Sequence, residues 1–171
     1  MPMAHERFEF DMPAPAEVVF DAFHYHCWRL RWDSLVSDTH VTDGAPCPYV
    51  GAVTENTGGG WMRGLAMSTR FVSFERPRLA AAAMVGRSFP FRSWAASMKH
   101  RPGREGRSVM VYTYTFEAGP PFLRWLIEPV VKRLFDRQTT RRFHRLQAFL
   151  AAHADEIVRW QHASAKDAEQ G

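Results

Sequence analysis

Residues 8–36, FEFDMPAPAEVVFDAFHYHCWRLRWDSLV, contain a strand pattern, a proline-punctuated turn and two helical patterns in close succession. The first five residues alternate apolar with acidic side chains, which is the period of a half-buried strand. Pro13 and Pro15 end this strand. Pro15 suits the first turn of a helix because it lacks the N–H group that would remain unpaired there. The stretch therefore predicts a chain that begins a sheet and then leaves it for a helix.

Two short amphipathic helices are predicted after this turn. Apolar side chains recur at helical spacing over residues 16–23, and Glu17 is placed favourably against the helix dipole. Trp28, Trp32 and Leu35 repeat the apolar stripe in a second helix. Because such a stripe needs an apolar environment, we expect the two helices to cover one end of a cavity.

From residue 37 to residue 117 the pattern changes to strands and turns. Strands are predicted at residues 51–55, 62–74, 79–85, 91–100 and 108–116. Turn dipeptides and the run PGREG at residues 102–106 separate them. Strands at this spacing, joined by short turns, are typical of an antiparallel meander.

After the Gly-Pro-Pro run at residues 119–121, helical periodicity returns and extends to about Trp160. Apolar residues fill both halves of this helix, but Gln138, Thr139 and Arg142 interrupt the apolar face near its middle. Polar groups at inner positions need partners, water or a ligand. One hypothesis is that one of the three reaches a pocket and orients the polar end of a ligand. The alternative is that the middle of the helix overhangs solvent.

The two ends of this helix carry further predictions. Pro129 either kinks the helix or marks its true start, since the proline ring conflicts with a preceding helical turn. Residues 161–171 are polar and predict a disordered tail. The folded domain is therefore expected to span residues 6–160.

Composition and charge favour one folded domain and restrict its partners. The chain of 171 residues is 46% hydrophobic and 13% aromatic, which allows a substantial core. No apolar run approaches the ~18 residues that span a bilayer, and the N-terminus lacks the apolar core of a signal peptide. We therefore expect no stable membrane insertion.

Two cysteines provide no disulfide framework, so a cytoplasmic protein is expected. The net charge of +4 is spread along the chain without a recognised nucleic-acid-binding module, so no nucleic-acid partner is expected.

Motifs for metal, cofactor or covalent chemistry are weak. In the run HYHC at residues 24–27 the histidines are two residues apart and do not share a helix face. The glycines at residues 58–60 lack the Lys-Ser/Thr of a phosphate loop, and the sequence has no G-x-S-x-G elbow. We expect no metal and no cofactor.

The order strand, two short helices, antiparallel strands and one long helix resembles the START-like helix-grip (SRPBCC) superfamily. That superfamily includes the polyketide cyclase/dehydrase and lipid-transport families. The residues that carry the resemblance are PAPAEVVF at 13–20, Trp32, GRSVMVY at 106–112 and FHRLQAFL at 143–150. The resemblance covers roughly residues 6–155. It implies an α+β helix-grip fold, in which a curved antiparallel β-sheet wraps around the long C-terminal α-helix and encloses a cavity.

The leading hypothesis is that this cavity binds a hydrophobic small molecule, lipid-like or polyketide-like, with affinity that comes mostly from burial of apolar surface. The predicted ligand contacts are Trp28, Trp32, Met67, Phe71, Trp94, Tyr112, Tyr114, Gln138, Thr139 and Arg142. For the aromatic residues and methionine among them, plain core packing is the alternative.

Two alternatives remain open. The first is an enzyme of the polyketide cyclase/dehydrase type, which needs tyrosine, arginine or histidine groups to polarise a carbonyl and move protons. By residue type alone, the catalytic candidates are Tyr112, Tyr114, Arg70 and His40. The second is a membrane-surface or protein-interaction module that uses residues 122–135, with Trp125 at the interface. Pro129 within that stretch counts against the second.

Overall fold

The computed structural model describes residues 3–59 and 62–169, and in this part of the chain seven strands form one antiparallel sheet. The strands are β1 (Ala4–Met12), β2 (Val36–Val41), β3 (Val53–Gly58), β4 (Ala66–Glu75), β5 (Leu79–Val85), β6 (Phe91–Pro102) and β7 (Ser108–Ala118). Their order across the sheet is β1-β7-β6-β5-β4-β3-β2, so strands β2 to β7 form a meander and β1 pairs with β7. The predicted antiparallel meander is confirmed.

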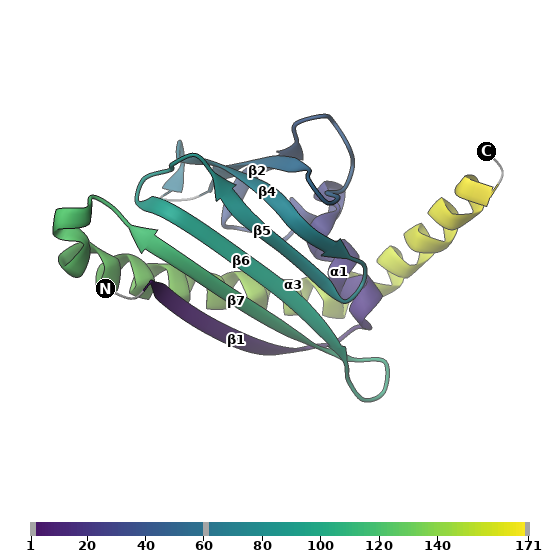
Figure 1. Cartoon of the computed structure of the whole chain (residues 1–171). Helices are drawn as coiled ribbons and strands as arrows, with labels where there is room; N and C mark the ends of the chain where they lie inside the picture. The colour runs from purple at the N-terminus through teal and green to yellow at the C-terminus, as the bar shows by residue number, and fades with distance from the viewer. Residues whose placement is uncertain (1–2, 60–61, 170–171) are drawn as a thin grey trace.

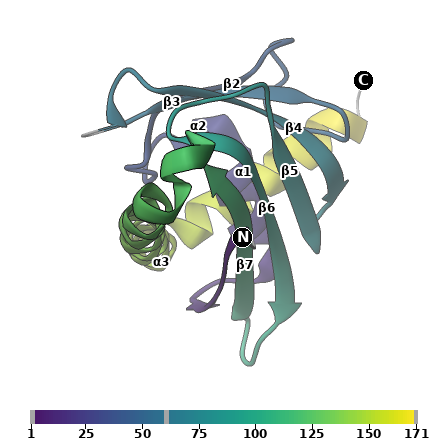
Figure 2. The same ribbon diagram turned by 60° about the vertical axis from the view of Figure 1, so that its left-hand side comes forward.

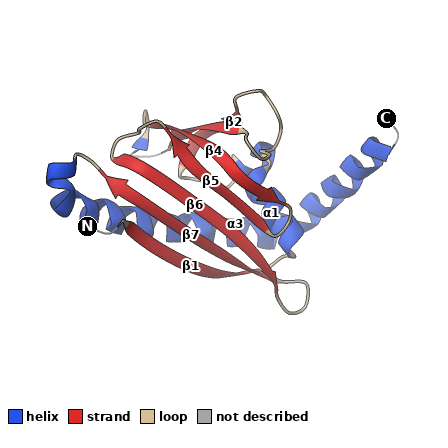
Figure 3. Cartoon of the chain, in the orientation of Figure 1, coloured by secondary structure: helices blue, strands red, loops and turns tan. Residues whose placement is uncertain are grey.

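The helices lie against one face of this sheet. Two short helices, α1 (Ala16–His24) and α2 (His26–Arg29), separate β1 from β2. A short 3-10 helix, η2 (Pro121–Leu123), leads from β7 into the long helix α3 (Arg124–Glu169). The sheet curves around one side of α3, as Figures 1 and 2 show. Figure 3 separates the strands of the sheet from the helix that crosses behind them. This arrangement is the predicted α+β helix-grip fold.

The core lies between the concave face of the sheet and α3. Alternate residues of β7 face it and are at most 4% exposed: Met110, Tyr112, Tyr114 and Phe116. From α3, the ring of Phe135 lies 4.8 Å from that of Tyr114, and the ring of Phe143 lies 5.0 Å from that of Tyr112. The period-two face of the strand and the apolar stripe of the helix therefore bury each other, which stabilises the fold by about 1.5–3 kcal/mol for each large apolar side chain.

The second short helix is shorter than predicted. α2 ends at Arg29, and Trp32 lies in a turn beyond it. Trp32 is nevertheless buried, and its indole N–H donates a hydrogen bond to the Ala22 carbonyl at 2.9 Å. The Asp33 carboxylate then accepts a hydrogen bond from the Leu35 N–H at 3.1 Å and helps to turn the chain into β2. Three apolar residues at helical spacing do not distinguish a helix from a buried turn.

Several strands differ from prediction. β1 begins at Ala4 rather than Phe8, and β3 spans Val53–Gly58 rather than residues 51–55. β2 has no counterpart among the predicted strands, because its sequence VSDTHV is mostly polar and it forms an edge of the sheet. β4 begins at Ala66 rather than at residue 62, since the chain turns at Gly64, where φ is 91°. Such a positive φ is readily adopted by glycine. β5 spans the predicted residues 79–85.

The long helix extends beyond the predicted domain. Pro129 lies inside α3 and does not mark its start. At the other end the helix continues from Gln161 to Glu169, where the sequence predicts a disordered tail. The side-chain amide of Gln161 donates a hydrogen bond to the Asp21 carboxylate at 2.6 Å. The residues beyond Gln161 are exposed, and this end of α3 projects past the sheet (Figure 1). Its three alanines favour the helix by their propensity rather than by packing. No helix in the described ranges is long and apolar enough to cross a membrane.

Candidate ligand-binding cavity

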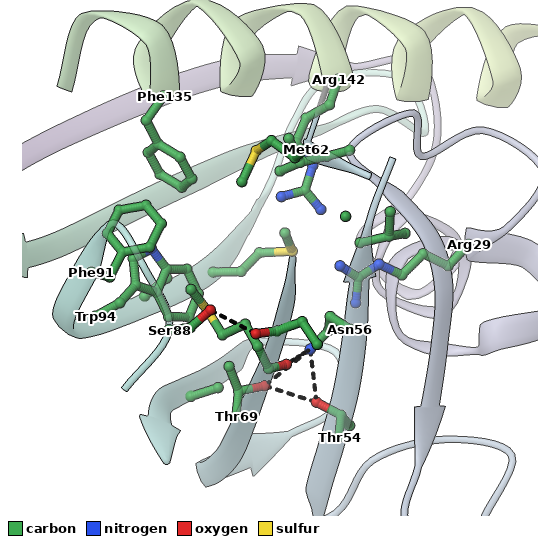
Figure 4. A pocket seen from close by; sticks show the side chains of 18 of the residues that line it. Arg29, Thr54, Asn56, Met62, Thr69, Ser88, Phe91, Trp94, Phe135 and Arg142 are labelled. Carbon is green, nitrogen blue, oxygen red and sulfur yellow. Dashed lines mark hydrogen bonds between the residues drawn. The ribbon is translucent and has the colours of Figure 1, made fainter. Parts of the chain in front are cut away.

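A cavity of about 140 Å³ lies between the sheet and α3. Its lining comes from strands β2 to β7 and from helices α1, α2 and α3, as the close view in Figure 4 shows in part. Most of this lining is apolar or aromatic, including Phe23, Met67, Phe71, Phe91, Trp94, Met98 and Phe135. Protein interiors rarely contain voids larger than a water molecule, so a space of this size needs a structural cause.

Small side chains in the middle of the sheet provide that cause. Ala80 and Ala82 on β5 and Ala96 on β6 line the cavity. Ala82 pairs directly with Ala96 across the two strands. Alanine is depleted in strands, where larger β-branched and aromatic residues pack better. The sequence LAAAAMV of β5 therefore leaves the inner face of the sheet without bulky side chains at its centre.

A second cavity of about 180 Å³ adjoins the first beside the N-terminal part of α3. The two cavities share five lining residues: Met62, Leu65, Phe89, Phe91 and Phe135. The second is also lined by Ile127, Val131 and Leu134 of α3. Because Phe89 is 72% exposed, the shared wall reaches the protein surface here. The two cavities are therefore neighbours, and the wall that they share lies near solvent.

A buried ionic cluster forms part of the wall of the main cavity. The Asp33 side chain is completely buried and accepts hydrogen bonds from Arg29 Nε at 3.0 Å and from Arg142 Nη2 at 2.5 Å. Arg29 comes from α2 and Arg142 from the middle of α3, and both line the cavity (Figure 4). Both guanidinium groups also lie over the Phe23 ring, at 4.7 Å and 5.2 Å from its centroid.

The electrostatics of this cluster keep all three groups charged at neutral pH. Burial raises the pKa of Asp33, but the guanidinium groups of Arg142 and Arg29 outweigh burial, and the pKa lies below its ordinary value. Burial lowers the pKa of Arg29, and the Asp33 carboxylate opposes that shift. Arginine stays protonated in proteins at neutral pH. Among the described residues, two guanidinium groups therefore share one carboxylate.

The other polar groups of the cavity are uncharged. His24 donates its Nδ1–H to the Phe20 carbonyl at 2.8 Å, and burial lowers its pKa to about 3. Burial raises the pKa of the Tyr112 hydroxyl, which is therefore a neutral phenol at pH 7. On the sheet, the hydroxyl oxygens of Thr54 and Thr69 lie 2.8 Å apart and bond to each other. Residues 3–59 and 62–169 contain no group of three or more histidine, cysteine or acidic side chains that could hold a metal ion.

Several predicted ligand contacts come together in this space. Those that line the main cavity are Met67, Phe71, Trp94, Tyr112 and Arg142. Gln138 lines the second cavity. Of the three polar residues that interrupt the apolar face of α3, Arg142 is therefore the one in the main cavity.

Four predicted contacts line neither cavity: Trp28, Trp32, Tyr114 and Thr139. Trp28 packs against Trp160, with ring centroids 5.7 Å apart. The Tyr114 hydroxyl donates a hydrogen bond to the Asp136 carboxylate. Thr139 is completely buried, and its Oγ1 has no hydrogen-bond partner in the part of the chain that the structure describes. These four side chains belong to the packed core around the cavity.

The catalytic candidates are dispersed. Tyr112 lines the main cavity, whereas Tyr114, Arg70 and His40 do not. Arg70 lies on the outer face of β4 and is exposed. His40 is exposed on the edge strand β2, where its Nδ1 lies 3.1 Å from the Asp38 carboxylate. Choosing candidates by residue type ignores the alternation of strand faces, which places neighbouring residues on opposite sides of the sheet.

Three important groups have no place among the predicted site residues: Arg29, Asp33 and the alanines of β5. In the segment CWRLRWD, Arg29 follows one tryptophan and Asp33 follows the next. Opposite charges four residues apart, beside an apolar stripe, are the sequence feature that could have indicated the cluster. The run of four alanines within a predicted strand is the signal for the cavity.

The chain was compared with protein families and with solved structures, and both comparisons give similar proteins. The family described as "Polyketide cyclase / dehydrase and lipid transport" matches residues 3–151 of the chain. Among solved structures, the chain is similar to the Zhui aromatase/cyclase from Streptomyces sp. R1128. The TM-score is 0.72 at 12% sequence identity, over 89% of this chain and 96% of that chain.

Two other solved structures have a similar fold. The protein XoxI from Bacillus cereus has a TM-score of 0.68 at 18% identity, over 86% of this chain and 96% of that chain. Ara h 8.0201 has a TM-score of 0.66 at 12% identity, over 88% and 99%. At these identities the likeness concerns the fold alone. No curated protein sequence matches the chain. Because the family match extends over most of the chain, the protein belongs to the polyketide cyclase/dehydrase and lipid-transport family of the START-like helix-grip (SRPBCC) superfamily.

Proposed function

We propose that the protein binds a hydrophobic small molecule in the cavity between the sheet and α3. The observation that carries this proposal is the cavity itself, about 140 Å³ in volume, with an apolar lining. An engineered apolar cavity of about 150 Å³ in another protein binds benzene, and here a second apolar cavity of about 180 Å³ lies next to the first. Removing apolar ligand surface from water contributes about 25 cal/mol per Å², so burial of the ligand supplies most of its affinity.

Two measurements test this proposal. Native mass spectrometry of freshly purified protein shows whether a lipid-like molecule co-purifies. In solution, the neutral fluorescent probe N-phenyl-1-naphthylamine reports binding to the cavity. Ala82→Phe fills the space and should weaken probe binding about tenfold or more. Ala83→Phe, a position on the same strand that does not line the cavity, is the matched control. Equal binding by the two variants, both folded by circular dichroism, would place the probe elsewhere and contradict the proposal.

Catalysis of the polyketide cyclase/dehydrase type is a second candidate function, favoured by the presence of Arg29, Arg142 and Tyr112 in one cavity. Guanidinium groups stabilise the oxyanion that forms when a ketone enolises, and a neutral phenol can donate a hydrogen bond to it. With a pKa of about 3, His24 is a poor general base at pH 7. The test is turnover of a synthetic poly-β-ketone thioester. Loss of turnover in Tyr112→Phe with unchanged probe binding supports catalysis, and unchanged turnover in Tyr112→Phe and Arg142→Met contradicts it.

Attachment to an anionic membrane surface is a third candidate function. Five apolar side chains on η2 and the first turns of α3 are 41–75% exposed: Phe122, Trp125, Leu126, Val130 and Leu134. Further along the same helix Arg133, Arg137 and Arg141 are exposed, and their charge complements anionic headgroups. Pro129 does not interrupt the helix, so this surface is continuous.

Co-sedimentation with vesicles tests the membrane proposal. Binding to vesicles of phosphatidylcholine and phosphatidylglycerol should exceed binding to phosphatidylcholine alone. Trp125→Ser should reduce it, whereas Val72→Ser, which alters a side chain 61% exposed on the outer face of β4, should not. If Trp125→Ser binds vesicles as well as the unmodified protein does, this surface is not the attachment site.

A further inference from the structure

The ionic cluster of Arg29, Asp33 and Arg142 holds two cations and one anion in a buried position. The exposed fractions of the three side chains are 13%, 0% and 5%. In the described part of the chain no carboxylate other than Asp33 forms an ion pair with either arginine. The nearby side chains His24 and Tyr112 are neutral at pH 7, because burial lowers the pKa of the first and raises that of the second. The cluster therefore carries an excess of one positive charge.

Within residues 3–59 and 62–169, the two arginines hold hydrogen-bond donors without partners. A guanidinium group has five N–H donors, and Asp33 accepts one from Arg29 and one from Arg142. The other oxygen of Asp33 accepts the Leu35 N–H. The Nε of Arg142 is buried and has no partner among the described residues. Because a buried donor without an acceptor costs free energy, an additional acceptor at this position would stabilise the cluster.

Contacts within the protein hold both guanidinium groups in place. They line the main cavity, and in Figure 4 both extend into the space that the labelled side chains surround. The Phe23 ring contacts both of them, at 4.7 Å for Arg29 and 5.2 Å for Arg142. Phe143 contacts Arg142 as well, with its centroid 5.2 Å from Cζ. Because these contacts already restrict the two arginine side chains, binding a ligand costs less side-chain entropy.

We propose that this cluster binds the anionic end of an amphiphile that carries a single negative charge on a planar oxygen group, such as a carboxylate. The apolar remainder of the molecule occupies the rest of the cavity, so the proposal rests on the binding function proposed above. A carboxylate matches the planar fork of a guanidinium group and balances the excess charge. A cationic ligand is repelled, and a dianion leaves a negative charge without a partner in an apolar space.

Paired ligands that differ in charge test this proposal on the unmodified protein. Straight-chain carboxylates from hexanoate to dodecanoate and the primary amides of the same lengths displace N-phenyl-1-naphthylamine at pH 7.5. At the best chain length, the dissociation constant of the carboxylate should be about tenfold or more below that of its amide. Equal affinities overturn the charge inference and leave the apolar binding function standing. If neither the probe nor any ligand binds, both proposals fail.

A series of variants assigns the preference to the cluster. Arg142→Met and Arg29→Met each bring the cluster to zero net charge and should make carboxylate and amide bind about equally. Asp33→Asn raises the net charge and should strengthen the preference. The matched control is Arg145→Met, because Arg145 donates to the Trp32 carbonyl at 3.0 Å and lines neither cavity. A preference that survives in both Arg29→Met and Arg142→Met assigns the cluster a structural role and overturns the proposal. The comparison on the unmodified protein holds even if Asp33→Asn does not fold.

Discussion

Replacing Asp33 with alanine measures how deeply the ionic cluster is buried. The carboxylate accepts three hydrogen bonds, from Arg29, from Arg142 and from the Leu35 N–H, and its side chain is completely buried. In Asp33→Ala two guanidinium groups remain in an apolar wall without a counterion. Removing one partner of a buried ion pair costs about 3–5 kcal/mol, which is the expected loss in the free energy of unfolding. At roughly 2–4 °C per kcal/mol for a chain of this size, the melting temperature should fall by roughly 6–20 °C.

Urea denaturation at pH 7, followed by circular dichroism, measures this loss. The control Glu156→Ala removes an exposed ion pair with Arg31 and should leave the stability unchanged. A triple variant, Arg29→Met with Asp33→Leu and Arg142→Met, removes every charge of the cluster and should remain close to the unmodified protein in stability. A loss below about 1 kcal/mol in Asp33→Ala would refute the reasoning, because it would mean that water reaches the two arginines.

Burial lowers the pKa of His100 from 6.5 to about 4. Between these two pH values His100 is protonated in the unfolded chain and neutral in the folded chain. The free energy of unfolding therefore falls as the pH decreases from 6.5 to about 4. His100→Phe should flatten that slope in urea titrations at several pH values, and an unchanged slope would contradict the burial. Leu146→Ala, at a completely buried position, should cost about 2–5 kcal/mol in urea denaturation. Leu134→Ala, at a position 41% exposed, should cost much less, and equal losses would contradict the packing of α3. Ending the chain after Gln161 removes exposed helix and should not change the melting temperature; a clear decrease would show that this end has a packing partner.

Periodicity predicts the fold because it reports which side of each element is buried. The alternation over residues 108–116 corresponds to β7, whose alternate residues face the core, and the run at residues 79–85 has the bounds of β5. The same signal is weak where burial is slight. β2 is a polar edge strand, and the turn around Trp32 imitates helical spacing without continuing the helix. The errors in the predicted elements therefore lie in a polar edge strand, in turns and at the ends of elements, including the C-terminal end of α3.

The site is predicted less completely, because its charges meet across long separations in the sequence. Arg142 interrupts the apolar face of α3, and that local irregularity predicts a polar group at the cavity. Its partner Asp33 lies 109 residues earlier in the chain, and no local pattern links the two. Thr139 interrupts the same face, but it is packed in the core. Helical periodicity shows which face is buried, but it does not show where a cavity separates the helix from the sheet.

The alanines at the centre of the sheet have a consequence for selectivity. The depth of the cavity depends on β5 and β6, where Ala80, Ala82 and Ala96 face it, whereas the arginines come from α2 and α3. If the proposed mode of binding is correct, ligand length and ligand charge are recognised by different elements of the fold. Replacing one alanine with valine or leucine should shorten the longest molecule that fits and leave the recognition of its charged end intact. Three such positions offer a graded set of binding proteins, each selecting a different chain length with the same preference for an anion.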